Sequence, residues 1–238
     1  MNLLAFDTST EMMSVAVSRV PGDAGQAGEV WQHTAPGGAQ TSANLIPTIQ
    51  RLMAQAGLQY WQLDAIAFGC GPGSFTGLRT ACAVAQGLAF GAQVKVLPVD
   101  TLLSVAEEAR ARHAAALQNY QVVALLDARM DEMYAGSYVF KNGHWTQIRD
   151  SRLIHPEGLV CEPGWTLAGN VFAAYGARLS APVAQRVDAL PTATAMLRLA
   201  PALLAAGAAV RADQALPLYI RDKVAKTTLE RAAEKAAL

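Results

Sequence analysis

The residues best suited to chemistry in this chain lie in two short segments. Asp7, Thr8 and Ser9 follow the apolar run 3–6, and a carboxylate with hydroxyls at a strand end is suited to organise a phosphate or its magnesium ion. The second segment, 69–77, reads Gly-Cys-Gly-Pro-Gly-Ser-Phe-Thr-Gly and opens onto a predicted helix. Glycines let backbone approach a bulky group, and the first amides of a helix carry partial positive charge. The corner could therefore hold an anion.

Both segments also have a purely structural interpretation. Asp, Ser and Thr favour turns because their side chains hydrogen-bond to nearby backbone. A later apolar run, 122–127, also ends in an aspartate and invites the same comparison. The candidate nucleotide-binding residues, with a simple turn as the alternative, are Asp7, Thr8, Ser9, Gly73 and Asp127.

Several catalytic arrangements cannot be found in the sequence. The four histidines are far apart and form neither His-x-x-x-His nor His-Glu-x-x-His. Gly-x-Ser-x-Gly is missing, so no nucleophile elbow is predicted. The corner 69–77 also lacks the Gly-Lys-Ser/Thr of a Walker loop. We predict no catalytic residue and no metal ligand.

The composition is typical of a compact globular protein. Of 238 residues, 52% are hydrophobic and 16% charged, and 19 basic residues balance 19 acidic ones. Zero net charge disfavours autonomous RNA binding, which depends on neutralising phosphates. The three cysteines include no Cys-x-x-Cys pair, which favours free thiols in the cytoplasm. We expect no signal peptide and no membrane segment, because Asp7 comes early and Arg198 interrupts the longest apolar region.

Hydrophobic periodicity predicts two rounds of similar elements. The first round has strands at 3–7, 13–18, 29–34, 64–70 and 94–99, with helices at 39–56 and 74–90. After a helix at 102–113, the second round has strands at 122–127, 132–140, 145–149 and 165–169, with helices at 156–160 and 192–206. Each round opens on a strand that ends in aspartate. The pattern therefore predicts a duplicated α/β domain.

The predicted subdomains span 1–103 and 104–222, followed by a tail at 223–238. The helix at 192–206 could pack back on the first subdomain, in which case a boundary near residue 103 would not be clean. The tail alternates charge and alanine, which predicts a solvated helix.

The helices at 39–56 and 74–90 are candidates for an interface. The second carries small residues throughout its length: Gly77, Ala81, Ala83, Ala85, Gly87 and Ala89. Small side chains let another helix approach closely, either in the core or from a second chain. Two such helices could form a four-helix interface with a matching pair. The candidate interface residues are Leu45, Ile49, Met53, Phe75, Leu78, Arg79 and Cys82.

Five strings, in order along almost the whole chain, resemble the TsaB family, also called YeaZ. They lie at 4–10, 63–79, 86–89, 125–129 and 217–221, and Gly-Pro-Gly-Ser-Phe-Thr-Gly-Leu-Arg is highly specific. The resemblance implies an α/β fold of the duplicated actin-like, Hsp70-like ATPase class (ASKHA), with two similar subdomains of mixed sheets flanked by helices. It also implies a bacterial subunit needed to make N6-threonylcarbamoyladenosine at position 37 of tRNAs that read codons starting with A.

The resemblance further implies two protein partners, the related subunit TsaD and the ATPase TsaE. TsaD carries metal-binding histidines in a His-x-x-x-His segment just after the strand that follows the Gly-Pro-Gly helix. Here Thr101 and Val105 occupy those positions, and they are poor metal ligands. We therefore expect a non-catalytic subunit that pairs with TsaD, forms a homodimer when alone and meets tRNA only through the complex.

Two alternatives stay open. One is an enzyme, either a nucleotide-dependent hydrolase or transferase or a glycopeptidase-like protein, which would use the cluster at Asp7. Against it, no glycine follows Asp7-Thr8, where actin-like ATPases commonly place one, and Asn170 departs from the Gly-x-Gly pattern common near Gly169. No cofactor of the chain's own is expected, although ATP or ADP with Mg²⁺ could bind at a subunit junction. The other alternative is a structural homodimer with a different duty.

Overall fold

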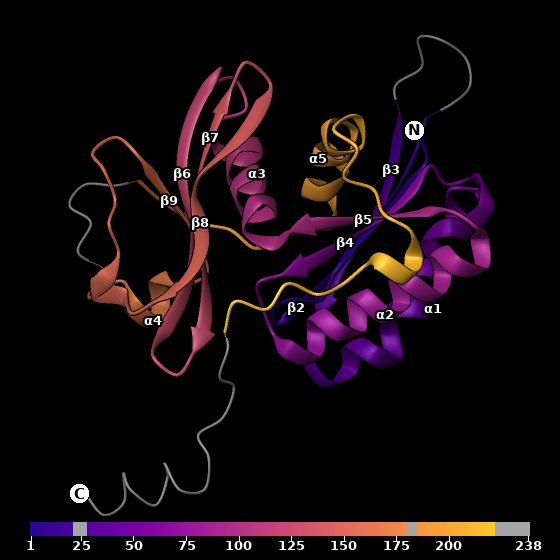
Figure 1. Cartoon of the computed structure of the whole chain (residues 1–238), viewed down its shortest axis with the longest axis horizontal. Coiled ribbons are helices and arrows are strands. Elements are labelled where there is room, and N and C mark those ends of the chain that lie inside the picture. Colours follow the sequence, from indigo (N-terminus) through magenta and orange to yellow (C-terminus); the bar gives the residue numbers. More distant parts are fainter. Residues whose placement is uncertain (21–27, 180–184, 222–238) are drawn as a thin grey trace, which may run out of the picture.

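The computed structural model describes residues 1–20, 28–179 and 185–221 and shows two lobes built on one plan (Figure 1). The described residues form two five-stranded sheets, with orders β3-β2-β1-β4-β5 and β8-β7-β6-β9-β10. In each sheet the first three strands along the chain are antiparallel, and the other two run parallel to the central strand. The duplication expected from the sequence is therefore confirmed in the strand order.

The elements of the first lobe are β1 (Leu3–Asp7), β2 (Met12–Arg19), β3 (Glu29–Pro36), α1 (Thr41–Gln55), β4 (Ala65–Gly71), α2 (Phe75–Ala92) and β5 (Lys95–Asp100). Those that follow are α3 (Thr101–His113), β6 (Asn119–Arg129), β7 (Glu132–Lys141), β8 (His144–Ile154), β9 (Thr166–Gly169), α4 (Phe172–Tyr175), β10 (Gln185–Asp188) and α5 (Ala193–Ala205). Short 3₁₀ helices lie at Gly38–Gln40, Tyr60–Gln62, Pro156–Gly158 and Ala212–Gln214.

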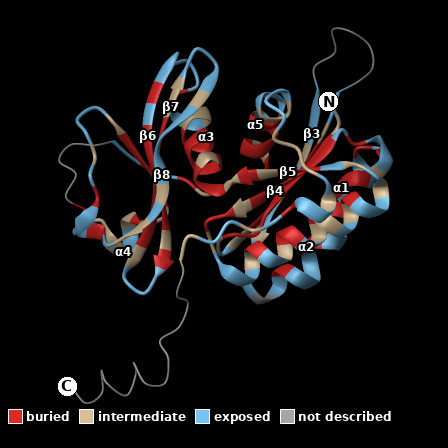
Figure 2. Ribbon diagram, viewed as in Figure 1, coloured by how far each residue is buried: buried red, intermediate tan, exposed pale blue. Residues whose placement is uncertain are grey.

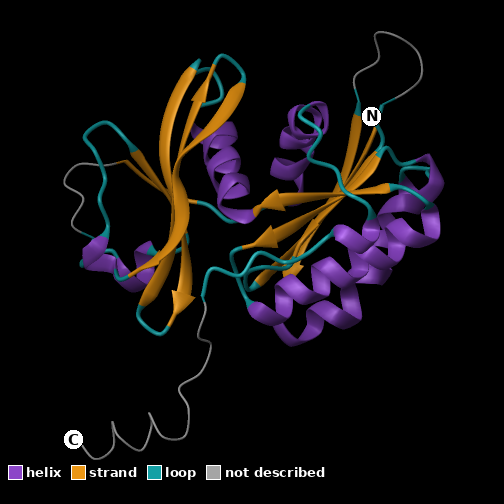
Figure 3. Cartoon of the chain, in the orientation of Figure 1, coloured by secondary structure: helices purple, strands orange, loops and turns teal. Residues whose placement is uncertain are grey.

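Alternation along the strands explains how the layers form. Leu4 and Phe6 of β1 point toward α1 and α2, whereas Leu3 and Ala5 point toward α5 on the opposite face. In the second lobe α3 covers one face of the sheet, and a smaller core beside α4 covers the other. Figure 3 shows these layers, and Figure 2 shows the buried residues gathering in the sheets and in α3 and α5 between them.

Helix α5 follows the second lobe in sequence but packs on the sheet of the first. Ala193, Met196 and Ala200 belong to the same core as Leu3 and Ala5. A cut near residue 103 would therefore separate α5 from the sheet that it covers. The subdomain boundaries stay a prediction, and the predicted tail helix at 223–238 lies outside the described residues.

Charged side chains join α3 to α5 between the lobes. Arg198 on α5 donates to Glu107 at 2.8 Å and to Glu108 at 2.7 Å, and both carboxylates are nearly buried. Trp145 on β8 and Arg110 on α3 also donate to Glu107. Burial alone would raise the pKa of Glu107, but these hydrogen bonds hold that pKa below its usual value. The network fixes the two lobes relative to each other.

Hydrophobic periodicity did not predict every element. Helix α4 and strand β10 have only four residues each and give little signal. Strand β8 extends five residues beyond the predicted end at Arg149, along an edge whose side chains are largely exposed. Asp100 caps α3, with its carboxylate accepting from Leu103 N at 2.9 Å. In the described part of the chain, no helix is long and apolar enough to cross a membrane.

Candidate functional site

The glycine corner packs directly against the turn that follows β1. Thr8 Oγ1 donates to the Gly77 carbonyl at 2.7 Å, and Ser74 N donates to the Ser9 carbonyl at 2.7 Å. A Cβ atom on Gly73 would lie 2.6 Å from Ser9 Cβ, and one on Gly77 would lie 1.8 Å from the Thr8 carbonyl oxygen. Glycine is therefore needed at both positions so that the turn after β1 can pack against the corner. The same corner leaves less room for a phosphate than the sequence suggested.

Asp7 is fully buried beneath this contact. Its Oδ1 accepts from Ser9 N at 2.9 Å and from Ser9 Oγ at 2.7 Å, whereas its buried Oδ2 has no hydrogen-bond partner in the described structure. Oδ2 lies close to Gly69 and near the methyl group of Met196. Burial raises the pKa of Asp7 to about 6, against the lowering effect of the Ser9 hydrogen bonds.

The raised pKa of Asp7 predicts a specific pH dependence of stability. The folded chain binds this proton more tightly than the unfolded chain, so the Asp7 contribution to stability falls as pH rises from 3.8 to about 6 and is constant above that. Asp7→Asn keeps an acceptor for Ser9 and removes the titration. Relative to the wild type, the variant should gain on the order of 2 kcal/mol between pH 4 and pH 7. Urea unfolding of both proteins across this range tests the prediction, and parallel profiles would contradict it.

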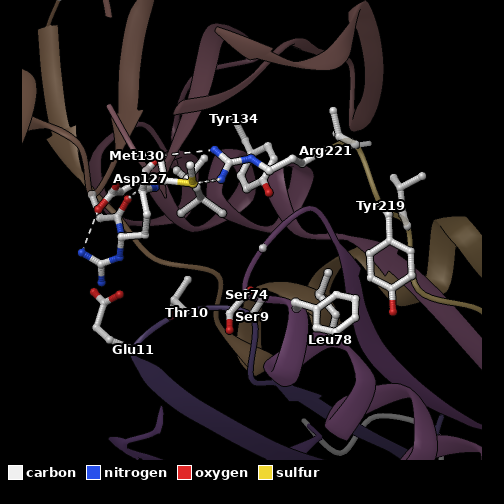
Figure 4. Close-up of a pocket in the computed structure, with 18 of the residues that line it drawn as sticks. Ser9, Thr10, Glu11, Ser74, Leu78, Asp127, Met130, Tyr134, Tyr219 and Arg221 are labelled. Carbon is white, nitrogen blue, oxygen red and sulfur yellow. Dashed lines mark hydrogen bonds and ion pairs between the residues drawn. The ribbon is translucent and has the colours of Figure 1, made fainter. Parts of the chain in front are cut away.

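A cleft of about 450 Å³ lies between the lobes beside the corner (Figure 4). Ser9, Thr10 and Glu11 line one side, and Asp127 and Met130 face them from the end of β6. Leu78, Tyr134, Leu218 and Tyr219 add apolar walls. The structure thus brings Ser9, Gly73 and Asp127 to one cleft, as their candidate role requires. Asp7 and Thr8 do not line it, because the turn directs them inward.

Asp127 is already engaged by neighbouring protein groups. Its Oδ1 accepts from Arg129 N at 2.8 Å and from the Tyr175 hydroxyl at 2.9 Å. Its Oδ2 pairs with the Arg129 guanidinium at 3.0 Å. The side chain of Asn170 accepts from Asp127 N at 2.9 Å, so the departure from Gly-x-Gly has a structural use. These bonds leave little of the carboxylate for an incoming cation.

The segment 217–221, for which the sequence predicted no role, crosses between the lobes at this cleft. Leu218 N donates to the Cys70 carbonyl at 2.7 Å, and the Leu218 carbonyl lies where a Cβ on Gly71 would be. Arg221 reaches the second lobe and pairs with Glu132 at 2.6 Å. The string Pro-Leu-Tyr-Ile-Arg therefore packs against the glycine corner and the helix that follows it. Arg79 and Tyr219, which share a hydrogen bond, are 140 residues apart in the sequence.

The interface prediction is wrong for five residues, which are buried in the chain's own core: Leu45, Ile49, Met53, Leu78 and Cys82. The first three form the apolar stripe by which α1 packs on the sheet. Cys82 on α2 belongs to the same core, and Leu78 is buried beside the cleft. Only Phe75 and Arg79 of the predicted set are exposed.

The outer face of α1 and α2 is nevertheless exposed (Figure 2), and it includes the apolar side chains Ile46, Phe75 and Phe90. On α2 the exposed stripe contains Arg79, Ala83, Gly87 and Phe90, with Phe90 74% exposed. On α1 the exposed residues include Ala43, Ile46, Pro47, Gln50, Arg51 and Ala54. Among the described residues, no atom lies within 4 Å of where a Cβ on Gly87 would be, so packing there does not require glycine. Glycine in a helix costs about 1 kcal/mol relative to alanine, and its small size leaves room for a close approach from outside.

Two matching mixed sheets, a cleft at the ends of their central strands and helices on the sheet faces define the actin-like, Hsp70-like ATPase fold class. Comparison with known proteins narrows this class. A family model described as TsaD, tRNA N6-adenosine threonylcarbamoyltransferase, matches residues 32–236. The chain belongs to the TsaB (YeaZ) family, within the wider group that this model covers.

Three relatives illustrate the match. The Haemophilus influenzae protein named "tRNA threonylcarbamoyladenosine biosynthesis protein TsaB" is 34% identical over 94% of this chain and 95% of its own length. The Escherichia coli protein of the same name is 31% identical over 94% of this chain and 96% of its own length. The solved structure of YeaZ from Pseudomonas aeruginosa has a TM-score of 0.79 at 38% identity and covers 92% of this chain and 99% of that one.

Proposed function

We propose that this chain is a non-catalytic subunit of the machinery that transfers threonylcarbamoyl to N6 of adenosine 37 in tRNAs reading codons that start with A. It binds TsaD, works with TsaE and meets tRNA only through that complex in the cytoplasm. Alone, it forms a homodimer. The names of its relatives, which refer to tRNA threonylcarbamoyladenosine biosynthesis, support the pathway.

The observation that carries the non-catalytic role is the local structure at Thr101 and Val105, where TsaD is expected to hold its metal histidines. Thr101 Oγ1 accepts from Gly71 N at 3.1 Å, and the residue is fully buried. Val105 is buried in the core between α3 and the second sheet. Both side chains serve to hold α3 in place. A histidine pair here would displace that packing.

The outer face of α1 and α2 supports the binding role. Two exposed helices with small residues and an exposed Phe90 provide a surface that a matching helix pair can approach closely. TsaD is expected to share the fold and therefore to present an equivalent pair. The four helices would then form the interface.

A reconstitution assay tests this function. The purified chain is supplied with tRNA and threonylcarbamoyl-adenylate, first alone and then with TsaD and TsaE. We expect transfer only when TsaD and TsaE are present, and loss of transfer when this chain is left out. Transfer by the isolated chain would reject the proposal.

One observation favours a second candidate function, nucleotide-dependent chemistry in the cleft, since Ser9, Gly73 and Asp127 all line it. The inward position of Asp7 and the occupied carboxylate of Asp127 favour the first proposal. We propose that the chain carries no cofactor of its own and that any ATP or ADP with Mg²⁺ lies at a subunit junction. Calorimetric titration of the isolated chain with MgATP distinguishes the two, because tight saturable binding would favour the enzyme.

A further inference from the structure

Arg79 is held rigidly on the outer side of α2. Its guanidinium carbon lies 3.9 Å from the centroid of the Phe75 ring, and its Nε donates to the Tyr219 hydroxyl at 3.1 Å. The two rings are 5.5 Å apart, and both are more than 40% exposed. Among the described residues, Arg79 donates a side-chain hydrogen bond through Nε alone, so its two Nη groups can still donate to other partners. A guanidinium fixed in this way loses little entropy when it binds a carboxylate.

No carboxylate lies within ion-pair distance of Arg79 among residues 1–20, 28–179 and 185–221. Asp213, in the 3₁₀ helix that contacts α2, pairs instead with Arg211 at 2.7 Å. The stacked Arg79 guanidinium is therefore available to pair with a carboxylate that the described part of the chain does not supply.

The whole helical face shares this lack of acids. Helices α1 and α2 contain no aspartate or glutamate, and their only charged residues are Arg51 and Arg79, both exposed. Two copies of this chain joined through these helices would bring two Arg79 side chains into the interface without a carboxylate from any of the four helices. Like charges placed together in an interface oppose association, whereas complementary ones favour it.

We propose that Arg79 selects the partner of this surface: a helix pair that presents aspartate or glutamate opposite the stacked guanidinium, in preference to a second copy of the same chain. The inference rests on the proposed function, in which the partner is TsaD. Phe75 and Tyr219 act as positioning residues, since they orient the fork. The contact of 217–221 with the glycine corner would then have a role in binding, because it places Tyr219 against α2.

The test measures association at about 50 and about 500 mM NaCl. The distance over which an exposed charge acts shortens from about 10 Å to a few ångströms as the salt concentration rises. Affinity of the full-length wild-type chain for TsaD should fall as salt rises, whereas self-association should hold or strengthen. Arg79→Met keeps apolar volume over Phe75 and should weaken TsaD binding about tenfold, remove most of the salt effect and strengthen self-association. Arg79→Lys keeps the charge but loses the planar fork, so its affinity for TsaD should lie between those of the wild type and Arg79→Met.

Arg186→Met is the matched control, because Arg186 is another exposed arginine over a ring, 5.9 Å from Phe172 and outside α1 and α2. It should bind and self-associate as the wild type does. Equal TsaD affinity of Arg79→Met and wild type, or wild-type binding that ignores salt, would overturn the inference while leaving the partnership intact. Failure of the wild type to bind TsaD would instead overturn the proposed function and this inference with it. Self-association needs no partner, so unchanged self-association of Arg79→Met would count against the charge argument by itself.

Discussion

Ala83→Trp is expected to lower the affinity for TsaD by about a hundredfold or more while leaving the fold intact. Ala83 is exposed at the middle of the α2 stripe, between Arg79 and Gly87. An indole there meets solvent in the monomer, but it would hold a partner helix away from the whole face. Close packing at the centre of an interface tolerates no such displacement. Threonylcarbamoyl transfer by the mixture should fall in parallel.

Ala202→Trp provides the matched control for this substitution. Ala202 is an exposed alanine in α5, on the opposite side of the first sheet. Its replacement adds the same side chain to the same kind of helical position, and it should leave affinity and transfer unchanged. If both tryptophan variants bind TsaD like the wild type, the interface does not lie on α1 and α2.

The second large effect concerns two glycines of α2 that should respond in opposite directions to alanine. In Gly77→Ala the new Cβ would meet the Thr8 carbonyl oxygen at 1.8 Å, so backbone has to move. We expect a loss of about 2 to 3 kcal/mol in the free energy of unfolding, after the gain in helix propensity is counted. In Gly87→Ala the new Cβ meets nothing within 4 Å, and the variant should gain about 0.5 to 1 kcal/mol.

Chemical denaturation of the two variants and the wild type measures both effects in one series. Each variant makes the same chemical change in the same helix, so helix propensity acts alike on both. The difference between them reports the contact between the corner and the turn after β1. Equal stability of the two variants would mean that Gly77 is not needed for that contact.

Periodicity was enough to predict the duplicated architecture, for a clear physical reason. Strand β1 is buried and ends in Asp7, and the buried run 122–126 of β6 is followed directly by Asp127, so each is recognisable as an apolar run that stops at a polar residue. The helices from Thr41 and Phe75 carry stripes that their own sheet buries. Short elements such as β10 depend on neighbours for their structure, and their few residues hold no comparable pattern.

The interface residues were misplaced because the strongest apolar stripe of a helix marks its attachment to its own sheet. Leu45 and Ile49 had the right spacing for a docking face, but that spacing serves the core. The exposed face of each helix can be recognised only once its buried face is known. Of the small residues that the sequence singled out in this helix, Ala83 and Gly87 lie on the exposed face.

The cleft could not be assembled from sequence patterns, because its walls come from six separate stretches of the chain. Ser9 and Gly73 belong to motifs that were recognised, whereas Met130, Tyr134 and Tyr219 approach them only through the relative placement of the lobes. That placement depends on the network around Arg198 and on the crossing of 217–221, both of which join residues about 90 or more positions apart. No local signal carries such information.

The most direct test of the account titrates this chain into a fixed amount of TsaD, with TsaE, tRNA and threonylcarbamoyl-adenylate in excess, and follows the rate of transfer. A helper that acts by docking should raise the rate until every TsaD is occupied, with half the effect at the dissociation constant found by direct binding. A rate that keeps rising in proportion after TsaD is saturated, or that persists without TsaD, would show that the chain itself performs the reaction.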